Sequence, residues 1–213
     1  MQQRHEAADS LDDFPTPPWA TRALIRHVIG PAIGGEALLS AMSVWEPACN
    51  RGFMARPLAE YFGDVYASDV CGYGWVGQGA GLIDFLIPGL EPPAIEHLGV
   101  DWIISNPPFR LAEQFIQRGL DLARRGVAML VRTSFLEGVG RHNSLYADMP
   151  PSIIAQFAER VPMVRGRYDP EASTATSYCW VVWVRGHAGT KFVWIPPCRR
   201  ELERKADWEV EHA

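Results

Sequence analysis

The sequence predicts an α/β fold, with a doubly wound parallel sheet covered by helices on both faces. Short apolar runs recur along the chain without polar alternation, which is typical of strands that are buried on both faces. Helical patterns lie between several of these runs, and this alternation favours parallel strands joined by helical crossovers. The predicted strands cover 42–46, 64–69, 81–86, 101–105, 126–132, 152–158 and 178–185, and the predicted helices cover 17–29, 53–62 and 110–124.

Length and composition predict one soluble domain. The chain has 213 residues, 47% of them apolar, which is enough for one full core. No stretch approaches the roughly 20 apolar residues of a membrane span, and the polar, acidic N-terminus does not resemble a secretory signal. We expect a flexible segment over 1–12, a single domain over 13–198 and a charged tail over 199–213.

The cysteines and the charge pattern narrow the expected partners. The four cysteines are scattered, which predicts reduced thiols in a cytoplasmic protein, with no metal site. A net charge of −5 argues against a nucleic-acid partner, because phosphate contacts need positive charge. Residues 118–167 nevertheless hold eight arginines against four acidic residues. The planar fork of arginine suits phosphate, although a codon bias toward arginine explains the pattern equally well.

The turn after the first predicted strand has the composition of a nucleotide-binding turn. Glu46 ends the strand, a tight turn of mostly small residues follows through Gly52, and a helix is predicted next. Such a turn lets backbone approach a ligand and aims helix N–H groups at it. Asn50 stands where glycine is commoner, but asparagine tolerates a left-handed backbone. The alternative is an ordinary strand-to-helix turn.

Acidic residues also follow the next two strands. Asp69 lies 23 residues after Glu46, the separation at which doubly wound nucleotide sites place an acceptor for the ribose hydroxyls. Asp84 follows the third apolar run. We therefore expect Glu46, Asp69 and Asp84 to line one pocket at the carboxyl edge of the sheet. The run Gly72–Gly77 matches GxGxxG, but no helical pattern follows it, so we do not interpret it as a dinucleotide motif.

The sequence Asn106-Pro107-Pro108-Phe109 directly follows the fourth predicted strand. Two prolines fix the backbone, so we expect Asn106 and the carbonyl of Pro107 to face outward from the sheet edge. Together these oxygens can accept both hydrogens of an aromatic amine and aim its lone pair at an electrophile. Phe109 offers a face on which a planar base can stack. The alternative is a simple turn, since Asn-Pro is a common turn signal.

These motifs resemble those of the class I S-adenosylmethionine-dependent amino-methyltransferases that act on adenine in DNA. Phe14-Pro15-Thr16-Pro17 looks like the N-terminal motif of that family, and its place before the Glu46 turn resembles the gamma-type motif order. Two stretches, 132–138 and 175–180, look like those of compact phage or prophage members. The resemblance covers roughly 13–185. It implies a Rossmann-like sheet of seven strands, mostly parallel with one antiparallel strand, flanked by helices.

The resemblance also implies roles for individual residues. The cofactor would be S-adenosylmethionine, and the product N6-methyladenine in DNA. The residues implied for cofactor binding are Phe14, Thr16, Pro17, Glu46, Ala48, Asn50, Gly52, Asp69, Asp84 and Asn106, with Asp69 on the ribose and Asp84 on the adenine. The residues implied for catalysis are Asn106, Pro107, Pro108 and Phe109. No dedicated base is needed before attack, because the amine becomes acidic only once it is methylated.

A DNA acceptor imposes further requirements. A base inside a duplex must flip out to reach such a pocket. The candidate phosphate contacts are Arg141, Arg160, Arg165 and Arg167, for which a solvated charged face is the alternative. The segment Val161–Pro170 would pack against the flipped base, with Met163 and Tyr168 as candidates. Trp19 would either cover the cofactor or lie in the core.

Three alternatives stay open at this point. The same motif serves N-methylation of RNA and of protein glutamine, and the dozen residues before Phe14 favour DNA over these. N4 of cytosine is disfavoured, because that group usually has serine in place of Asn106. A non-catalytic relative that binds nucleic acid is the alternative from a different class. No large target-recognition domain follows residue 185, so strong sequence specificity is not expected. The sequence does not predict an oligomeric state.

Overall fold

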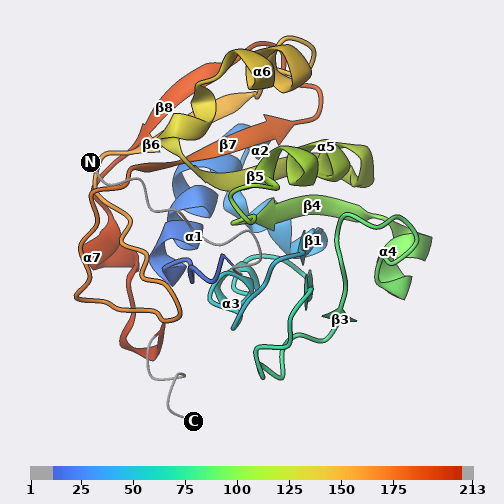
Figure 1. The fold of residues 1–213 in the computed structure, drawn as a ribbon, viewed down its shortest axis with the longest axis horizontal. Helices are drawn as coiled ribbons and strands as arrows, with labels where there is room; N and C mark the ends of the chain where they lie inside the picture. Colours follow the sequence, from blue (N-terminus) through green and yellow to red (C-terminus); the bar gives the residue numbers. More distant parts are fainter. Residues whose placement is uncertain (1–11, 208–213) are drawn as a thin grey trace.

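Apolar strands form the centre of the molecule as one eight-stranded sheet, in the order β3-β2-β1-β4-β5-β7-β6-β8 (Figure 1). The computed structural model describes residues 12–207, and everything below refers to that range. The strands are β1 (Ser43–Glu46), β2 (Asp64–Asp69), β3 (Gly81–Leu82), β4 (Val100–Ser105), β5 (Ala123–Arg132), β6 (Ile153–Phe157), β7 (Tyr178–Val184) and β8 (Lys191–Ile195). Strand β7 runs antiparallel to β5 and β6, and the other pairings are parallel.

The predicted doubly wound fold is confirmed, with one correction to the strand number. The sequence predicts seven strands, whereas the described residues form eight. The additional strand, β8, pairs with β6 at the edge of the sheet. Of its five residues only Ile195 is buried, and an edge strand of this kind lacks the buried pattern that marks the central strands.

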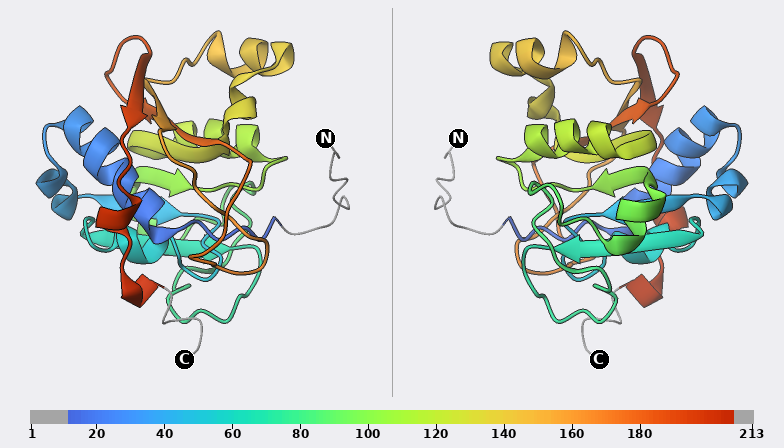
Figure 2. Two further views of the ribbon diagram at one scale, coloured as in Figure 1. Left: turned by 90° about the vertical axis from the view of Figure 1, so that its left-hand side faces the viewer. Right: turned by 90° about the vertical axis from the view of Figure 1, so that its right-hand side faces the viewer.

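Helices cover both faces of the sheet, as the two side views in Figure 2 show. They are α1 (Pro18–Leu24), α2 (Gly30–Ile33), α3 (Ala55–Leu58), α4 (Pro93–Leu98), α5 (Ala112–Leu122), α6 (Val139–Arg141) and α7 (Arg199–Leu202). A π-helical turn over Ile25–Ile29 joins α1 to α2, and another over His142–Tyr146 follows α6. None of these helices is long and apolar enough to cross a bilayer.

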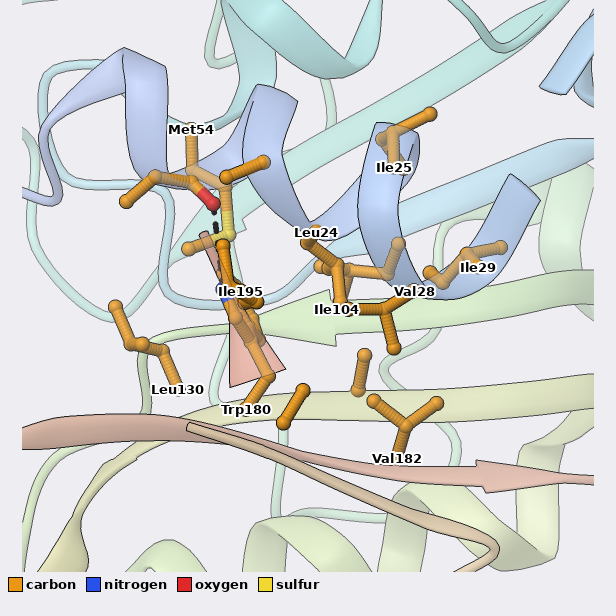
Figure 3. Close-up of a cluster of buried hydrophobic side chains, with 14 of the residues drawn as sticks. Leu24, Ile25, Val28, Ile29, Met54, Ile104, Leu130, Trp180, Val182 and Ile195 are labelled. Atoms are coloured by element: carbon orange, nitrogen blue, oxygen red, sulfur yellow. Dashed lines mark hydrogen bonds between the residues drawn. The ribbon is translucent and has the colours of Figure 1, made fainter. Parts of the chain in front are cut away.

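Neighbouring residues of each central strand point into different apolar layers. In β4, Ile104 packs in the layer that contains α1, whereas Ile103 packs in the layer that contains α5. Figure 3 shows Leu24 and Val28 packed toward the sheet, close to Ile104 and Val182. Burying one such aliphatic side chain contributes about 1.5–3 kcal/mol to stability. These two layers hold β1, β2 and β4 rigidly side by side, with their carboxyl ends at one edge.

Several predicted boundaries shift in the structure. Thr16 is not the N-cap of the first helix, because α1 begins at Pro18 with Pro17 at the cap and no side-chain cap bond. The helix predicted over 53–62 is α-helical only over Ala55–Leu58. The strand predicted over 81–86 is only Gly81–Leu82, after which the chain turns away from the sheet. No helix directly follows Gly72–Gly77, in agreement with its rejection as a dinucleotide motif.

The termini fall partly outside the described residues. The flexible segment expected over 1–12 lies outside them except for Asp12, and so does the part of the charged tail from 208 onward. The described part of the tail packs against α1. Leu202 is buried, and the guanidinium of Arg22 donates hydrogen bonds to the Leu202 carbonyl and to both carboxylate oxygens of Asp207.

The buried ion pair between Arg22 and Asp207 generates a prediction about stability. Both side chains are nearly inaccessible to solvent, at 3% and 7% exposed, so the loss of Asp207 leaves a buried charge with only Glu60 as its counter-ion. We expect Asp207→Ala to lower the free energy of unfolding by about 3 kcal/mol, measured by urea denaturation.

The exposed pair between Arg26 and Glu201 is the matched control, since it joins the π-helical turn after α1 to α7 and so links the same two regions of the chain. Glu201→Ala is expected to change the free energy of unfolding by less than about 1 kcal/mol. Equal effects of the two variants would mean that burial of the Arg22 pair does not matter.

Candidate active site

A cavity lies at the carboxyl ends of β1, β2 and β4, where the sequence analysis expects a ligand. The free space inside it is about 70 Å³. Of the residues proposed from the sequence, the structure places eight in its lining: Phe14, Thr16, Glu46, Ala48, Asn50, Asp69, Asn106 and Pro108. Strands β2, β1 and β4 are neighbours in the sheet, which explains why residues far apart in sequence meet here.

The turn after β1 adopts the strained geometry expected for it. Asn50 has a φ of 49°, and it is the only non-glycine residue with positive φ in the described part of the chain. Its backbone N–H donates to Oδ2 of Asp69 at 2.9 Å, which joins the end of β1 to the end of β2. The prediction that asparagine replaces glycine at a left-handed position is confirmed.

Glu46 is buried at the bottom of the cavity, with 2% of its surface exposed. Burial raises the pKa of its carboxyl group well above the usual value, and the charge of Asp69 raises it further. A hydrogen bond from the backbone of Ala55 and the charge of Arg56 oppose this shift. Its Oε2 atom has no hydrogen-bond partner among residues 12–207. A buried carboxylate oxygen without a partner is costly, so this position favours a cationic or N–H-bearing ligand group.

Asp69 is held by the backbone rather than by a side chain. Oδ1 accepts a hydrogen bond from the N–H of Cys71 at 3.0 Å, and Oδ2 accepts the bond from Asn50. Burial raises the pKa of Asp69, and these backbone bonds lower it. Each oxygen keeps lone-pair capacity, because a carboxylate has about four acceptor sites. Its fixed position at the cavity suits a ligand with neighbouring hydroxyl groups.

Asn106 presents its side-chain oxygen as an unused acceptor. Its Nδ2 atom donates to the carbonyl of Phe14 at 3.0 Å, which fixes the orientation of the amide. Its Oδ1 atom is buried and has no partner in the described structure. This oxygen therefore has free capacity to accept a hydrogen bond from an N–H or O–H group.

The segment Asp12–Thr16 contacts both the turn after β1 and the turn after β4. Oδ2 of Asp12 accepts the backbone N–H of Phe109 at 2.7 Å. Oδ1 of Asp13 accepts a hydrogen bond from Nδ2 of Asn50 at 2.6 Å, and Arg51 forms an ion pair with the same carboxylate. Asp12 and Asp13 are not among the site residues predicted from the sequence. Two adjacent acids directly before the Phe-Pro-Thr-Pro motif were the available signal.

Some of the proposed residues lie outside this cavity. Asp84 does not line it, which corrects the expectation of three acidic strand ends around one pocket. Strand β3 ends at Leu82, and the exposed carboxylate of Asp84 accepts the N–H of Leu86 in its own turn. Gly52 and Pro17 also do not line it. A Cβ atom at Gly52 would lie 2.5 Å from the ring of Trp75, so glycine is required there by the close approach of the indole.

Pro107 and Phe109 line a second cavity, with about 190 Å³ of free space. Its other lining residues are Ala112, Val131, Arg132, Ser134, Phe135 and Arg141. The guanidinium carbon of Arg132 lies 3.8 Å from the ring centroid of Phe109, and the ring of Phe14 packs at 5.4 Å from the same ring. The face that the sequence analysis left open for a base is thus covered by Arg132.

The four arginines proposed as phosphate contacts differ in their surroundings. Arg141 lines the second cavity and donates to the carbonyls of Phe135 and Glu137. Arg160 donates to the Ala175 carbonyl and the Ser177 hydroxyl, and Arg167 pairs with Asp169. Arg165 is exposed.

The loop Val161–Pro170 reaches the candidate site from the end of β6. Sδ of Met163 lies 3.7 Å from Nδ2 of Asn106, and the N–H of Gly166 donates to the carbonyl of Asp13. Tyr168 is buried against Phe53, with its hydroxyl donating to Glu203. Trp19 is completely buried and packs edge-on against Phe157 in the core, so it does not cover the cavity.

Comparisons with known proteins support the fold. No family model matches the sequence, and no curated protein was found to resemble it. A modification subunit of a proposed type I restriction enzyme from Vibrio vulnificus YJ016 is similar in structure, with a TM-score of 0.59, 16% identity, and coverage of 95% of this chain and 51% of that one. This chain therefore spans about half the length of that subunit.

Two further solved structures share the fold. A proposed RNA methyltransferase from Pyrococcus horikoshii has a TM-score of 0.56 and 13% identity, and the match covers 86% of this chain and 92% of that one. A proposed class I S-adenosylmethionine-dependent methyltransferase from Listeria monocytogenes has a TM-score of 0.54 and 14% identity, with coverage of 91% and 68%. At these identities the likeness is one of fold, and this chain has the α/β fold of class I methyltransferases.

Proposed function

We propose that this protein transfers a methyl group from S-adenosylmethionine to the exocyclic N6 amine of an adenine that is flipped out of DNA. One observation carries the proposal: the buried Oδ1 of Asn106 has no partner in the described part of the chain, and its orientation is fixed by the bond from Nδ2 to the Phe14 carbonyl. An acceptor oxygen held at a strand end beside a cavity suits an amine whose lone pair must be directed.

The residues around the first cavity fit the proposed cofactor. The unpartnered Oε2 of Glu46 would accept a hydrogen bond from its ammonium group, and the carboxylate of Asp69 would accept bonds from its ribose hydroxyls. Thr16, Ala48 and Asn50 would contact the rest of it. The role proposed for Asp84 on the adenine requires the turn after β3 to move toward the cavity.

The first cavity must enlarge before a nucleotide-sized ligand can enter it. Its free space of about 70 Å³ is well below the roughly 300–1,000 Å³ of typical ligand pockets. We infer that the segment Asp12–Thr16, or the loop that carries Tyr73, shifts outward when a nucleotide-sized ligand enters.

S-adenosylmethionine, when bound, supplies an electrophilic methyl group on a sulfonium centre. The chain's own residues position the acceptor. Oδ1 of Asn106 and the carbonyl of Pro107 accept the two amine hydrogens, which directs the nitrogen lone pair toward the cofactor. Positioning of this kind accounts for up to about 7–11 kcal/mol of a barrier. No side chain is required to remove a proton before attack.

DNA is favoured as the acceptor on two grounds. The stretch 118–167 is rich in arginine within an acidic chain, and the similar Vibrio vulnificus structure is described as a modification subunit of a restriction enzyme. RNA is the second candidate, because the likeness to the proposed RNA methyltransferase has nearly the same TM-score. Methylation of a protein glutamine remains the third.

The choice of acceptor is tested directly. The protein is incubated with labelled S-adenosylmethionine and plasmid DNA, total RNA or cell extract, and the modified nucleosides are identified by mass spectrometry. We expect N6-methyladenine in the DNA. Label confined to RNA or to protein would reject the DNA assignment, and no transfer to any acceptor would reject the enzyme.

Substitution of Asn106 tests the role of its oxygen. Asn106→Ala removes the acceptor for the amine hydrogen, so we expect methyl transfer to fall by ~10²-fold or more. The dissociation constant for S-adenosylmethionine, measured by isothermal titration calorimetry, should change little. Asn143→Ala, at an exposed asparagine outside both cavities, is the matched control. Loss of cofactor binding in Asn106→Ala would mean that the motif is misplaced.

The raised pKa of Glu46 predicts how cofactor binding depends on pH. Below that pKa the carboxyl is protonated and does not pair with an ammonium group, so affinity should rise with pH through the raised pKa of Glu46 and then level off. Calorimetric titrations with S-adenosylmethionine, carried out at pH values on both sides of this pKa, measure the change in affinity. Glu46→Gln should bind more weakly and without this rise. An identical pH profile in Glu46→Gln would show that Glu46 does not contact the ammonium group.

A further inference from the structure

The Asn106–Phe109 turn contributes residues to two cavities of opposite charge. The first cavity is lined by the carboxylates of Asp12, Glu46 and Asp69, and no arginine or lysine is among its described lining residues. The second is lined by Arg132 and Arg141, and no aspartate or glutamate is among its described lining residues. A cationic ligand group suits the first cavity, and an anionic one suits the second.

Both arginines of the second cavity hold unused hydrogen-bond donors. Arg132 stacks on Phe109, with its guanidinium carbon 3.8 Å from the ring centroid, and Arg141 stacks on Phe135 at 4.0 Å. In each side chain the Nε–H group is buried and has no acceptor within the described residues. Neither guanidinium forms an ion pair there. Buried donors without acceptors are uncommon and indicate a missing partner.

Phosphate is the anion that this arrangement fits best. Arginine presents its donors as a planar fork that matches phosphate oxygens, and two such forks share this cavity with the hydroxyl-bearing side chain of Ser134. The free space of about 190 Å³ accommodates a phosphate group with part of a sugar. The proposed acceptor is a nucleotide, which carries a phosphate next to its base.

The position of Arg132 also bears on the entry of the acceptor base. Its guanidinium covers a face of the Phe109 ring, so a base that stacks on that face must take its place. A phosphate in the second cavity would give the displaced guanidinium a new hydrogen-bond acceptor. Arg132 would then lose its stacking contact with Phe109 and gain a contact with the phosphate.

We propose that the second cavity binds the phosphate adjacent to the acceptor base, through Arg132, Arg141 and Ser134, and that Arg132 leaves the ring of Phe109 to do so. This inference rests on the proposed function, because it takes the acceptor to be a nucleotide. Arg132 is a binding and positioning residue in this account. Its removal weakens the hold on the nucleic acid rather than on the cofactor.

The salt dependence of DNA binding tests the proposal. Binding of a fluorescent oligonucleotide is measured by anisotropy at several salt concentrations, for the wild type, Arg132→Met, Arg132→Lys and Ser134→Ala. A lost phosphate contact reduces the slope of log K against log salt by about 0.7–0.9. We expect this reduction in Arg132→Met and not in Arg132→Lys, which keeps the charge. Ser134→Ala should weaken binding with the slope retained. Arg200→Met, at an exposed arginine of α7, is the matched control.

A direct readout uses the Nε–H signals of arginine in NMR spectra of the whole protein. The signal that disappears in Arg132→Met is assigned to Arg132. We expect this signal to shift when inorganic phosphate is added and to stay in place when chloride is added to the same ionic strength. No phosphate-specific shift, or an unchanged salt slope in Arg132→Met, would overturn the phosphate site.

These outcomes separate the phosphate site from the proposed function. DNA binding with an altered slope but without methyl transfer would overturn the proposed enzyme activity and leave the phosphate site intact. Methyl transfer with an unchanged slope in Arg132→Met would overturn the site alone. A wild type that binds no DNA would overturn the DNA assignment, and the response of the Arg132 Nε–H signal to inorganic phosphate would then decide whether the phosphate site exists. Circular dichroism confirms that each variant is folded.

Discussion

The hydrogen bond from Nδ2 of Asn106 to the carbonyl of Phe14 is the interaction on which the candidate site depends. It joins residues that are 92 positions apart and determines which end of the amide faces the ligand. Without it, the amide can rotate and present its N–H groups, which cannot accept the hydrogens of an amine. The bonds of Asp12 to Phe109 and of Asp13 to Asn50 hold the Phe14 carbonyl in place. The segment Asp12–Thr16, which precedes α1, therefore determines which atom of the Asn106 amide, at the end of β4, is free to contact a ligand.

The contrast in charge between the two cavities resolves an apparent conflict in the composition. A chain with a net charge of −5 is a poor candidate for binding nucleic acid as a whole. The acidic groups Glu46 and Asp69 line the first cavity, however, whereas Arg132 and Arg141 lie together in the second. Local charge decides which ligand group each cavity accepts, because interactions between exposed charges are screened beyond about 8–10 Å.

The sequence predicts the parts of the site that depend on local pattern, and it misses those that depend on tertiary contacts. Glu46, Asp69 and Asn106 are predictable because each ends or directly follows a buried strand, and parallel strands bring their carboxyl ends to one edge. Asp84 does not lie at this edge, because β3 has only two residues and the chain leaves the sheet before Asp84. The roles of Asp12 and Arg132 arise from contacts with Phe109, and no periodicity or spacing in the sequence encodes them.

The segment Asp12–Thr16 links the two halves of the proposed reaction. It lines the first cavity, whose free space is too small for a nucleotide-sized ligand, and it also supplies the carbonyl that orients Asn106. A ligand that pushes this segment away removes the partner of Nδ2 and frees the amide to rotate. Any displacement of this segment therefore bears both on the first cavity and on the orientation of the Asn106 amide, because the two depend on the same few residues.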